Sequence, residues 1–239
     1  MSSPVDVQTE GRTRIITLNR PDKLNSLDAS TVDALTAEIE TANASDARLL
    51  VLKGAGRSFC AGFDLSRLDE QSEAELLLRF VRIELLLQAI CNSPALTLAL
   101  AHGKVFGAGV DLVAACRYRV ATEDTLFRMP GLKFGLVLGT RRFAALVGHE
   151  VARRVLEDTS SFDGRQAYGM GFVQEVAETG SWGAIIAKAV TRASSLDDDA
   201  RQDLYRTVST LEPDKDLATL VRSAARPGLK ERLMRYAAR

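Results

Sequence analysis

The amino-acid sequence predicts an α/β fold that ends in a helical tail. Apolar, β-branched runs typical of strands begin near residues 14, 49 and 96, and segments with apolar residues at helical spacing lie between them. The chain has 239 residues, of which 46% are hydrophobic and 26% charged, so it can bury a sizeable core. This alternation is expected of a right-handed wound or coiled arrangement of strands and helices.

Local signals set the boundaries of the first elements. The apolar run RIITL ends at a turn-forming Asn-Arg-Pro-Asp, and Asp28 can cap the helix that follows. A Gly-Ala-Gly closes the second strand, and Ser93-Pro94 stops the second helix, because the residue before a proline disfavours helical geometry. We therefore expect strands at residues 14–18, 49–52 and 95–100, and helices at residues 28–39, 72–92 and 110–116.

Helical periodicity dominates from about residue 139 onward, broken by one glycine-rich stretch and one β-like run. Because no low-complexity linker divides the chain, we expect a core over residues 1–190. A helical C-terminal region over residues 191–239 should then pack on the core or on a neighbouring subunit. The helical segments are 142–147, 151–156, 182–193 and 217–225, and the interruptions are 164–171 and 172–176.

The overall composition disfavours several classes of function. Lys plus Arg and Asp plus Glu both number 31, so the chain has no general attraction to nucleic acid or anionic membranes. No apolar stretch approaches the roughly 20 residues that span a bilayer, and the first residues lack the apolar centre of a signal peptide. Cys60, Cys91 and Cys116 occur at unrelated spacings, and no Cys-x-x-Cys is present. The sequence thus predicts a cytoplasmic protein without a metal site or disulfides.

Two glycine-rich segments, each after an expected strand, carry the chemical information. They are residues 56–65 (GRSFCAGFDL) and 103–112 (GKVFGAGVDL). Small residues let a backbone approach a ligand closely, and the second segment also opens a helix, whose first N–H groups lack intrahelical partners. Two such amides can stabilise a carbonyl oxygen that becomes negative during a reaction. From spacing alone, the alternative is a purely structural turn. The second segment could also be mistaken for a dinucleotide-binding loop, but it lacks the third glycine of that fingerprint.

Three segments together resemble the signatures of the enoyl-CoA hydratase/isomerase (crotonase) superfamily. They are residues 18–27 (LNRPDKLNSL), 59–65 (FCAGFDL) and 107–112 (GAGVDL), and the likeness runs from about residue 12 to 177. The resemblance implies a crotonase-like spiral of ββα repeats with a helical C-terminal region that forms trimers, often paired into hexamers. It also implies an acyl-CoA substrate in fatty acid metabolism, with coenzyme A as part of the substrate and no separate cofactor.

The resemblance assigns roles to individual residues. The two oxyanion-hole amides of the family match the backbone N–H groups of Phe63 and Ala108, and the first of its two glutamates matches Asp111. Asp111 stands in an otherwise apolar run, where an unpaired charge is unfavourable unless it is used. The segments that hold coenzyme A in the family match Lys23, Leu24, Ala61, Asp64, Leu65 and Gly107. For Lys23 a solvated turn lysine is the alternative, and Asp64 is also a typical turn former.

The second catalytic carboxylate of the family has no counterpart in this sequence. Pro130 matches the proline that precedes it, but the next residue is Gly131, and a later position that is acidic in other members falls at or near Gly139. Hydration needs one group to deprotonate water and another for the proton at the α-carbon. Isomerisation needs only one base, so this departure leaves the reaction type open.

Glu84 is the candidate for a substitute base. It shares an apolar helical face, from which it could line the acyl pocket with a raised pKa. The alternative is an ion pair with a neighbouring arginine, which is the more common state of a buried glutamate.

The sequence therefore predicts an acyl-CoA enzyme, with hydration of an enoyl-CoA as the first expectation. Double-bond isomerisation, decarboxylation, thioester hydrolysis and C–C cleavage remain alternatives, because all use the same stabilised enolate. A third possibility is an acyl-CoA-binding protein without catalysis, for which Gly131 is the supporting observation.

Overall fold

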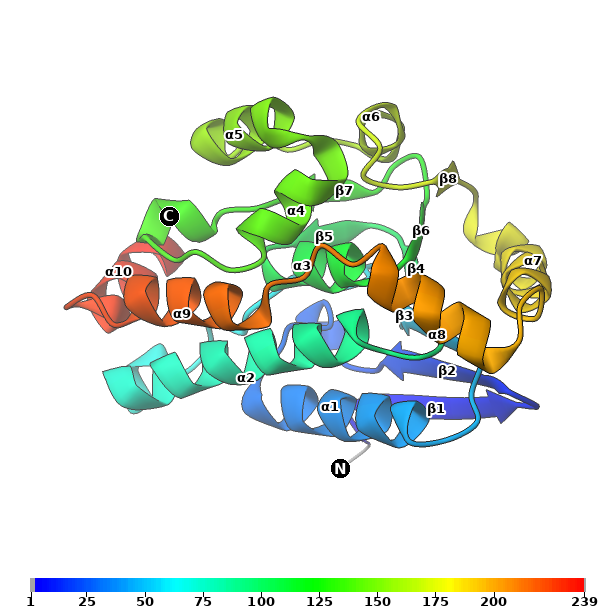
Figure 1. The fold of residues 1–239 in the computed structure, drawn as a ribbon. Helices are drawn as coiled ribbons and strands as arrows, with labels where there is room; N and C mark the ends of the chain where they lie inside the picture. Colours follow the sequence, from blue (N-terminus) through cyan, green and yellow to red (C-terminus); the bar gives the residue numbers. More distant parts are fainter. Residues whose placement is uncertain (1–2, 239) are drawn as a thin grey trace.

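A computed structural model describes residues 3–238 of the chain. Its centre is a six-stranded sheet in the order β1-β2-β3-β4-β6-β8, in which β1 is antiparallel to β2 and the other neighbours are parallel (Figure 1). Crossovers between parallel strands wind in one direction and make the core a spiral of repeating units. The strands are β1 (Val5–Glu10), β2 (Thr13–Leu18), β3 (Leu49–Gly54), β4 (Leu96–Ala101), β6 (Tyr118–Ala121) and β8 (Glu175–Val176).

A second, two-stranded sheet continues from the carboxyl ends of the main strands. β5 (Lys104–Phe106) follows β4 after a two-residue turn and pairs in parallel with β7 (Leu126–Arg128), which follows β6. A bridge between Cys60 and Val105 joins the segment after β3 to this sheet. The segments that leave β3, β4 and β6 therefore converge at one edge, which is where ligands bind in open α/β sheets.

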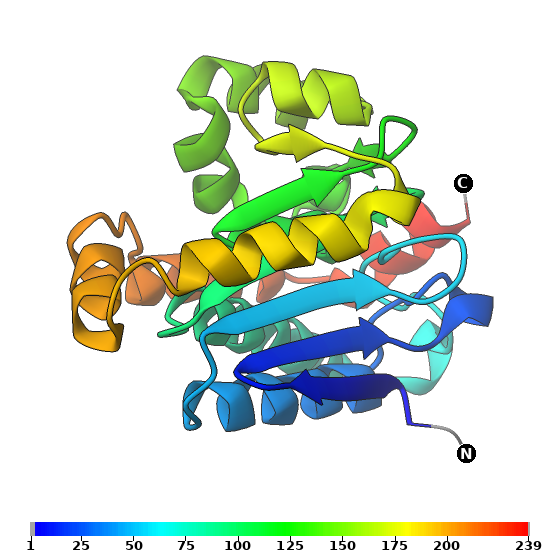
Figure 2. The same ribbon diagram turned by 90° about the vertical axis from the view of Figure 1, so that its right-hand side faces the viewer.

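Helices cover both faces of the main sheet. α1 (Ala29–Asn43), α2 (Glu73–Cys91) and α3 (Ala108–Ala115) lie on one face, and α7 (Trp182–Ala193) lies on the other, in front of the strands in Figure 2. No helix within residues 3–238 combines the length and apolar character needed to cross a membrane. The remaining helices are α4 (Thr140–Val147), α5 (His149–Asp158), α6 (Gly164–Gly169), α8 (Asp198–Thr207), α9 (Pro213–Ala224) and α10 (Leu229–Ala237), with 3-10 turns at Pro21–Lys23, Leu68–Glu70, Gly131–Phe134 and Thr179–Ser181.

Alternate residues of the central strands enter two different apolar layers. Ile16 and Leu50 pack on the side of α1 to α3, whereas Ile15 and Val51 pack on the side of α7. Burial on both faces explains why these strands have nearly continuous apolar sequences instead of alternating ones.

The last helices fold back onto the core of the same chain. Leu220 of α9 and Leu229 and Leu233 of α10 are fully buried in a cluster with Leu76 and Phe80 of α2. This packing places α10 against α2 and against the 3-10 turns at Leu68–Glu70 and Gly131–Phe134 (Figure 1). Of the two expected locations of the C-terminal region, the structure shows contact with the chain's own core.

Most of the elements expected from the sequence are confirmed, and the differences have local causes. β2, β3, β4, α1, α2 and α3 lie where they were expected, within a few residues. β1, β5, β6 and β7 were not expected. β1, β5 and β7 are short or largely exposed at the surface, and the buried β6 has only four residues, one of them Arg119, so none of them has a continuous apolar run. The β-like run at residues 172–176 forms a strand only at its last two residues, and the expected boundary at residue 190 lies inside α7.

Candidate active site

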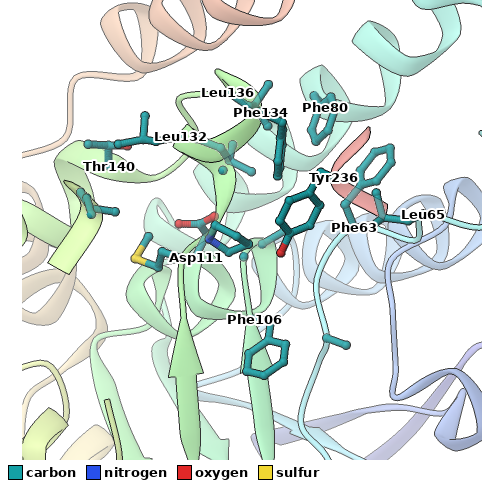
Figure 3. Close-up of a pocket in the computed structure, with 18 residues that line it drawn as sticks. Phe63, Leu65, Phe80, Phe106, Asp111, Leu132, Phe134, Leu136, Thr140 and Tyr236 are labelled. Atoms are coloured by element: carbon teal, nitrogen blue, oxygen red, sulfur yellow. The ribbon is translucent and has the colours of Figure 1, made fainter. Parts of the chain in front are cut away.

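A cavity of about 200 Å³ lies at the carboxyl edge of the sheet, between the start of α3 and α10 (Figure 3). Side chains from α2, α3, the segment at residues 129–140 and α10 point into it. In the described part of the chain, the lining side chains that can exchange a proton are Asp111, Thr140 and Tyr236. The apolar wall includes Phe63, Leu65, Phe80, Leu132, Phe134 and Leu136.

The two glycine-rich segments are in direct backbone contact at the cavity wall. Gly62 has a φ of +86°, and a Cβ on it would lie 2.4 Å from the carbonyl oxygen of Phe106 and 3.2 Å from the nitrogen of Ala108. A Cβ on Gly109 would lie 2.2 Å from the carbonyl oxygen of Cys60. Only glycine permits this approach, so the small residues of both segments serve to bring their backbones together.

Two backbone N–H groups from these segments are unpaired in the described residues. Leu27 donates to the carbonyl of Gly62 (2.7 Å) and accepts from the N–H of Asp64 (3.0 Å), so the N–H of Phe63 points to the opposite side. Ala108 is the first residue of α3, where an N–H has no intrahelical partner. Neither amide donates to a protein acceptor within residues 3–238, and both residues line the cavity. A ligand oxygen can therefore receive both hydrogen bonds.

Asp111 is the one carboxylate in the cavity wall, as far as residues 3–238 are concerned. It lies in the first turn of α3, is 2% exposed, and its Oδ1 is buried without a hydrogen-bond partner. Burial raises the pKa of Asp111 well above its ordinary 3.8; the positive charge of Arg142 opposes this effect, and the negative charge of Glu84 adds to it. The environment thus favours the protonated acid, which can donate a proton.

The structure gives a physical reason for the missing second carboxylate. Gly139 has a φ of +63°, and a Cβ on it would lie 1.8 Å from Oδ1 of Asp111. A side chain at that position would occupy the space that Asp111 already fills. Gly131 lines the cavity, and a Cβ there would lie 3.1 Å from the carbonyl oxygen of Leu136. As the sequence indicated, neither position supplies an acid, so Asp111 has no carboxylate partner at either of them.

Glu84 does not line the cavity, so its expected role as a substitute base needs correction. Its carboxylate accepts hydrogen bonds from Arg142, with 3.0 Å between Nη1 and Oε2, and a second, shorter contact from Nη2 to Oε1. Gln88 donates to Oε1 at 2.9 Å. Since both carboxylate oxygens are engaged by the guanidinium, the alternative reading of Glu84 as a buried ion pair is the one observed.

The residues matched to coenzyme A binding divide into two groups. Ala61, Leu65 and Gly107 line the cavity together with the residues of the expected oxyanion hole. Lys23 is exposed at the end of a 3-10 turn, and Leu24 follows it with a φ of +50°. The carbonyl of Leu24 accepts a hydrogen bond of 2.9 Å from Ala61, so the exposed turn is tied to the cavity segment.

Asp64 is part of the scaffold of this turn. Its carboxylate accepts hydrogen bonds from Arg20 (3.1 Å), Ser26 (3.1 Å) and both the N–H and hydroxyl of Ser66 (2.9 and 2.6 Å). Burial opposes ionisation, but the bonds from Ser66, Arg20 and Ser26 lower the pKa of Asp64 below its ordinary value. Asp64 therefore holds the turn together, which is the alternative role noted in the sequence, and its side chain does not line the cavity.

Sequence reasoning missed Tyr236, which closes the cavity from α10. Its ring packs on Phe134 with centroids 5.0 Å apart, and its hydroxyl points into the cavity (Figure 3). Leu229, Leu233 and Tyr236 follow each other at helical spacing of four and three residues, which was the available signal for one inward face of a last helix. That pattern does not show which cavity the face would cover.

Comparison with known proteins agrees with the resemblance drawn from the three motifs. The family model described as enoyl-CoA hydratase/isomerase matches residues 13–229. The chain is 34% identical over 179 residues to "Probable enoyl-CoA hydratase echA6" of Mycobacterium tuberculosis, with 72% of each chain covered. It is 30% identical over 179 residues to "Ethylmalonyl-CoA decarboxylase" of Mus musculus, covering 69% of this chain and 52% of the mouse protein.

Solved structures confirm the crotonase-like fold. A crystal structure of a Bordetella parapertussis protein, named in the enoyl-CoA hydratase/isomerase class, has a TM-score of 0.98 and 48% identity over the full length of both chains. The enoyl-CoA hydratase structure from Bacillus halodurans has a TM-score of 0.86 at 21% identity, covering 98% of this chain and all of the other. The second likeness concerns the fold alone.

Proposed function

The chain belongs to the enoyl-CoA hydratase/isomerase family, and from its site we propose that it is an acyl-CoA enzyme that stabilises the enolate of a thioester. The observation that carries this proposal is a pair of unpaired backbone N–H groups, from Phe63 and Ala108, in the same cavity as the buried acid Asp111. These are the two functions that enolate chemistry requires: stabilisation of an oxyanion and transfer of a proton at carbon.

The thioester carbonyl would accept hydrogen bonds from the amides of Phe63 and Ala108. These bonds strengthen as negative charge moves onto the oxygen, so they favour the enolate over the bound ester. The N-terminal end of α3 adds a positive partial charge at Ala108. Because the glycine contacts fix both segments before a ligand arrives, little reorganisation is needed. In other enzymes the loss of one such donor costs about 2.7–4 kcal/mol of transition-state stabilisation.

Asp111 would transfer the proton at the α-carbon, and hydration of an enoyl-CoA is the reaction we propose first. In its protonated form Asp111 can deliver this proton while water adds to the β-carbon, and the carboxylate formed in this way takes up the proton that the added water releases, which regenerates the acid. The hydroxyls of Tyr236 and Thr140 are the other polar side-chain groups in the wall, and we assign them the orientation of that water. Lys23 and the segment from Ala61 to Leu65 would hold coenzyme A.

Deuterium exchange at the α-carbon of butyryl-CoA tests enolate formation without presupposing the full reaction. Exchange requires the ionised carboxylate to remove the α-proton, so we expect the wild type to label the α-position in D₂O at a rate that rises with pH, because the pKa of Asp111 is raised. Asp111→Asn should lose this labelling on the order of a hundredfold or more while still binding the ester. Asp33→Asn, an exposed change on α1, is the matched control and should exchange normally. Binding by the wild type without exchange, without hydration of crotonyl-CoA and without release of CO₂ would instead identify a non-catalytic acyl-CoA-binding protein.

Decarboxylation of a 2-carboxyacyl-CoA is the second candidate. This reaction needs one proton donor and no base, and a protonated acid without a carboxylate partner meets that requirement. Loss of CO₂ leaves the bonding electrons as an enolate at the two amides, and Asp111 then donates its proton to the α-carbon and is reprotonated by solvent. The apolar wall disfavours the substrate carboxylate and favours its departure as neutral CO₂. Release of CO₂ from ethylmalonyl-CoA, without loss of the conjugated absorbance of crotonyl-CoA, would select this reaction over hydration.

We further propose a homotrimer, or a pair of trimers, that acts in the cytoplasm in fatty acid metabolism without a cofactor beyond the substrate's coenzyme A. Exposed apolar side chains at the end of α8, Leu204 and the following Val208, offer surface for subunit contacts. Light scattering after size-exclusion chromatography would give the subunit number directly, and a monomeric mass would remove the trimer from the proposal.

A further inference from the structure

A buried ion pair lies behind the catalytic acid and has no part in the chemistry proposed above. Glu84 of α2 is 1% exposed and Arg142 of α4 has a side chain 5% exposed, and the guanidinium contacts both carboxylate oxygens. Removing two charges from water is unfavourable, so such a pair is weak evidence for a stabilising role. Its retention in the interior calls for another explanation.

The pair is placed to act on Asp111. α4 starts directly after Gly139, whose Cα lies against the Asp111 carboxyl, and Arg142 is in the first turn of that helix. Arg142 and Glu84 are the charged groups that act directly on Asp111, with opposite effects on its pKa, and a group that pairs with Arg142 can act through it. The Nε of Arg142 and the Oδ1 of Asp111 are both buried without partners.

The other groups around Asp111 are neutral or distant. Burial raises the pKa of the Cys60 thiol to about 12, so that thiol is uncharged at neutral pH. β4 carries no titratable residue, and Lys104 of β5 is exposed to solvent. Tyr236 of α10 lines the same cavity.

We propose that Glu84 and Arg142 are positioning residues that set the charge state of Asp111 by presenting a balanced pair of charges behind it. This inference rests on the proposed role of Asp111 as the proton carrier. With the pair intact, repulsion by Glu84 opposes attraction by Arg142, and burial keeps Asp111 protonated. Without Glu84, the uncancelled cation would favour the ionised carboxylate, which cannot donate a proton.

The pair also connects the acid to the C-terminal helices. Oδ2 of Asp216 in α9 lies 3.6 Å from Nη2 of Arg142, and its Oδ1 accepts two hydrogen bonds from Arg141, at 2.9 and 3.1 Å. Gln88 bridges Glu84 and the carbonyl of Pro213 at the start of α9, at 2.9 and 3.1 Å. Docking of α9 therefore completes the charge environment of Asp111.

Infrared titration of the protonated carboxyl C=O stretch tests this proposal in the substrate-free protein. Each variant is compared with the same variant carrying Asp111→Asn, so that the difference spectrum reports Asp111 alone. Glu84→Gln should shift the titration midpoint of Asp111 downward by about one pH unit or more, because Arg142 loses its counter-charge. Glu84→Gln combined with Arg142→Met should return the midpoint to within about half a unit of wild type.

Two further variants give the experiment its controls. Asp198→Asn removes the partner of another buried arginine, Arg201, and should leave the midpoint unchanged. Asp216→Asn should lower the midpoint less than Glu84→Gln does, because its carboxylate is farther from Arg142 and more exposed. This milder variant keeps the proposal testable if Glu84→Gln does not fold.

Equal midpoints in wild type, Glu84→Gln and Asp216→Asn would overturn the proposal and make the pair purely structural. A midpoint that falls in Glu84→Gln but is not restored in the double variant would also contradict charge balance. Because the titration needs no substrate, its outcome is independent of the butyryl-CoA exchange assay. The charge-state proposal and the proposed function can thus fail separately.

Discussion

Asp111 combines two properties that are rarely found together in one carboxyl group, near-complete burial and an oxygen without a hydrogen-bond partner. An ionised carboxylate in this position would be strongly disfavoured, so the folded protein holds the acid in its neutral form. Such an arrangement weakens the fold at neutral pH, and it is typical of residues kept for chemistry. The pH dependence of stability can therefore detect it.

Asp111→Asn should make the protein more stable than wild type as the pH rises above about 4. The folded protein retains the Asp111 proton, whereas the unfolded chain releases it near the ordinary pKa of 3.8, so the stability of the wild type falls as pH rises through this window. Asparagine does not titrate and avoids this loss. The gain should be about 1.4 kcal/mol for each pKa unit of displacement.

Urea unfolding of both proteins across a pH series measures this difference. The two free energies of unfolding should approach each other below pH ~4, where Asp111 is protonated in both states. A difference that does not vary with pH would mean that the folded and unfolded states share the same Asp111 pKa.

At the scale of elements, the site is made by short segments that meet only because particular side chains are missing. The glycines and the expected strands were readable in the sequence, and so was the absence of acids at Gly131 and Gly139. The contact between Gly139 and Asp111 was not, because it depends on the φ of +63° and on a helix entering from another part of the chain. Pairing between distant segments is not encoded in local periodicity.

Gly139→Ala should destabilise the protein by about 1–3 kcal/mol more than Gly228→Ala does. Both glycines are in the left-handed region, with φ/ψ of +63°/−3° and +77°/+30°. A Cβ at position 139 meets the Asp111 carboxyl, whereas a Cβ at position 228 would lie at an ordinary contact distance of 3.5 Å from Oε2 of Glu231. Thermal unfolding of the two variants therefore separates steric overlap from the backbone strain that they share.

Asp111→Ala supplies the internal check on this explanation. In that background the added methyl group has no carboxyl to displace, so the penalty of Gly139→Ala should fall toward that of Gly228→Ala. Additive effects of the two changes would show that the loss arises from backbone strain and not from Asp111.

At the scale of the whole molecule, the cavity brings together segments far apart in the chain, from the first glycine-rich segment to the last helix. The resemblance in three motifs was sufficient for the fold and for the prediction that Phe63, Ala108 and Asp111 share one cavity, because those motifs are local. It did not reveal Tyr236 or the Glu84–Arg142 pair, because these depend on how α4, α9 and α10 pack on α2. Long-range packing of helices is the part that one sequence leaves undetermined.

Leu233→Ala should detach α10 from the core and open the cavity, while the sheet and its other helices persist. Leu233 is fully buried against the α2 cluster, and truncating a buried leucine costs about 2–5 kcal/mol, enough to undock a nine-residue helix at the end of the chain. Hydrogen exchange should accelerate in residues 229–237 but not in β3 or β4, and butyryl-CoA should bind more weakly because Tyr236 leaves the wall. Met234→Ala, which alters an exposed neighbour, should change neither quantity. Uniformly faster exchange across the sheet would show that α10 is part of a single cooperative unit with the core.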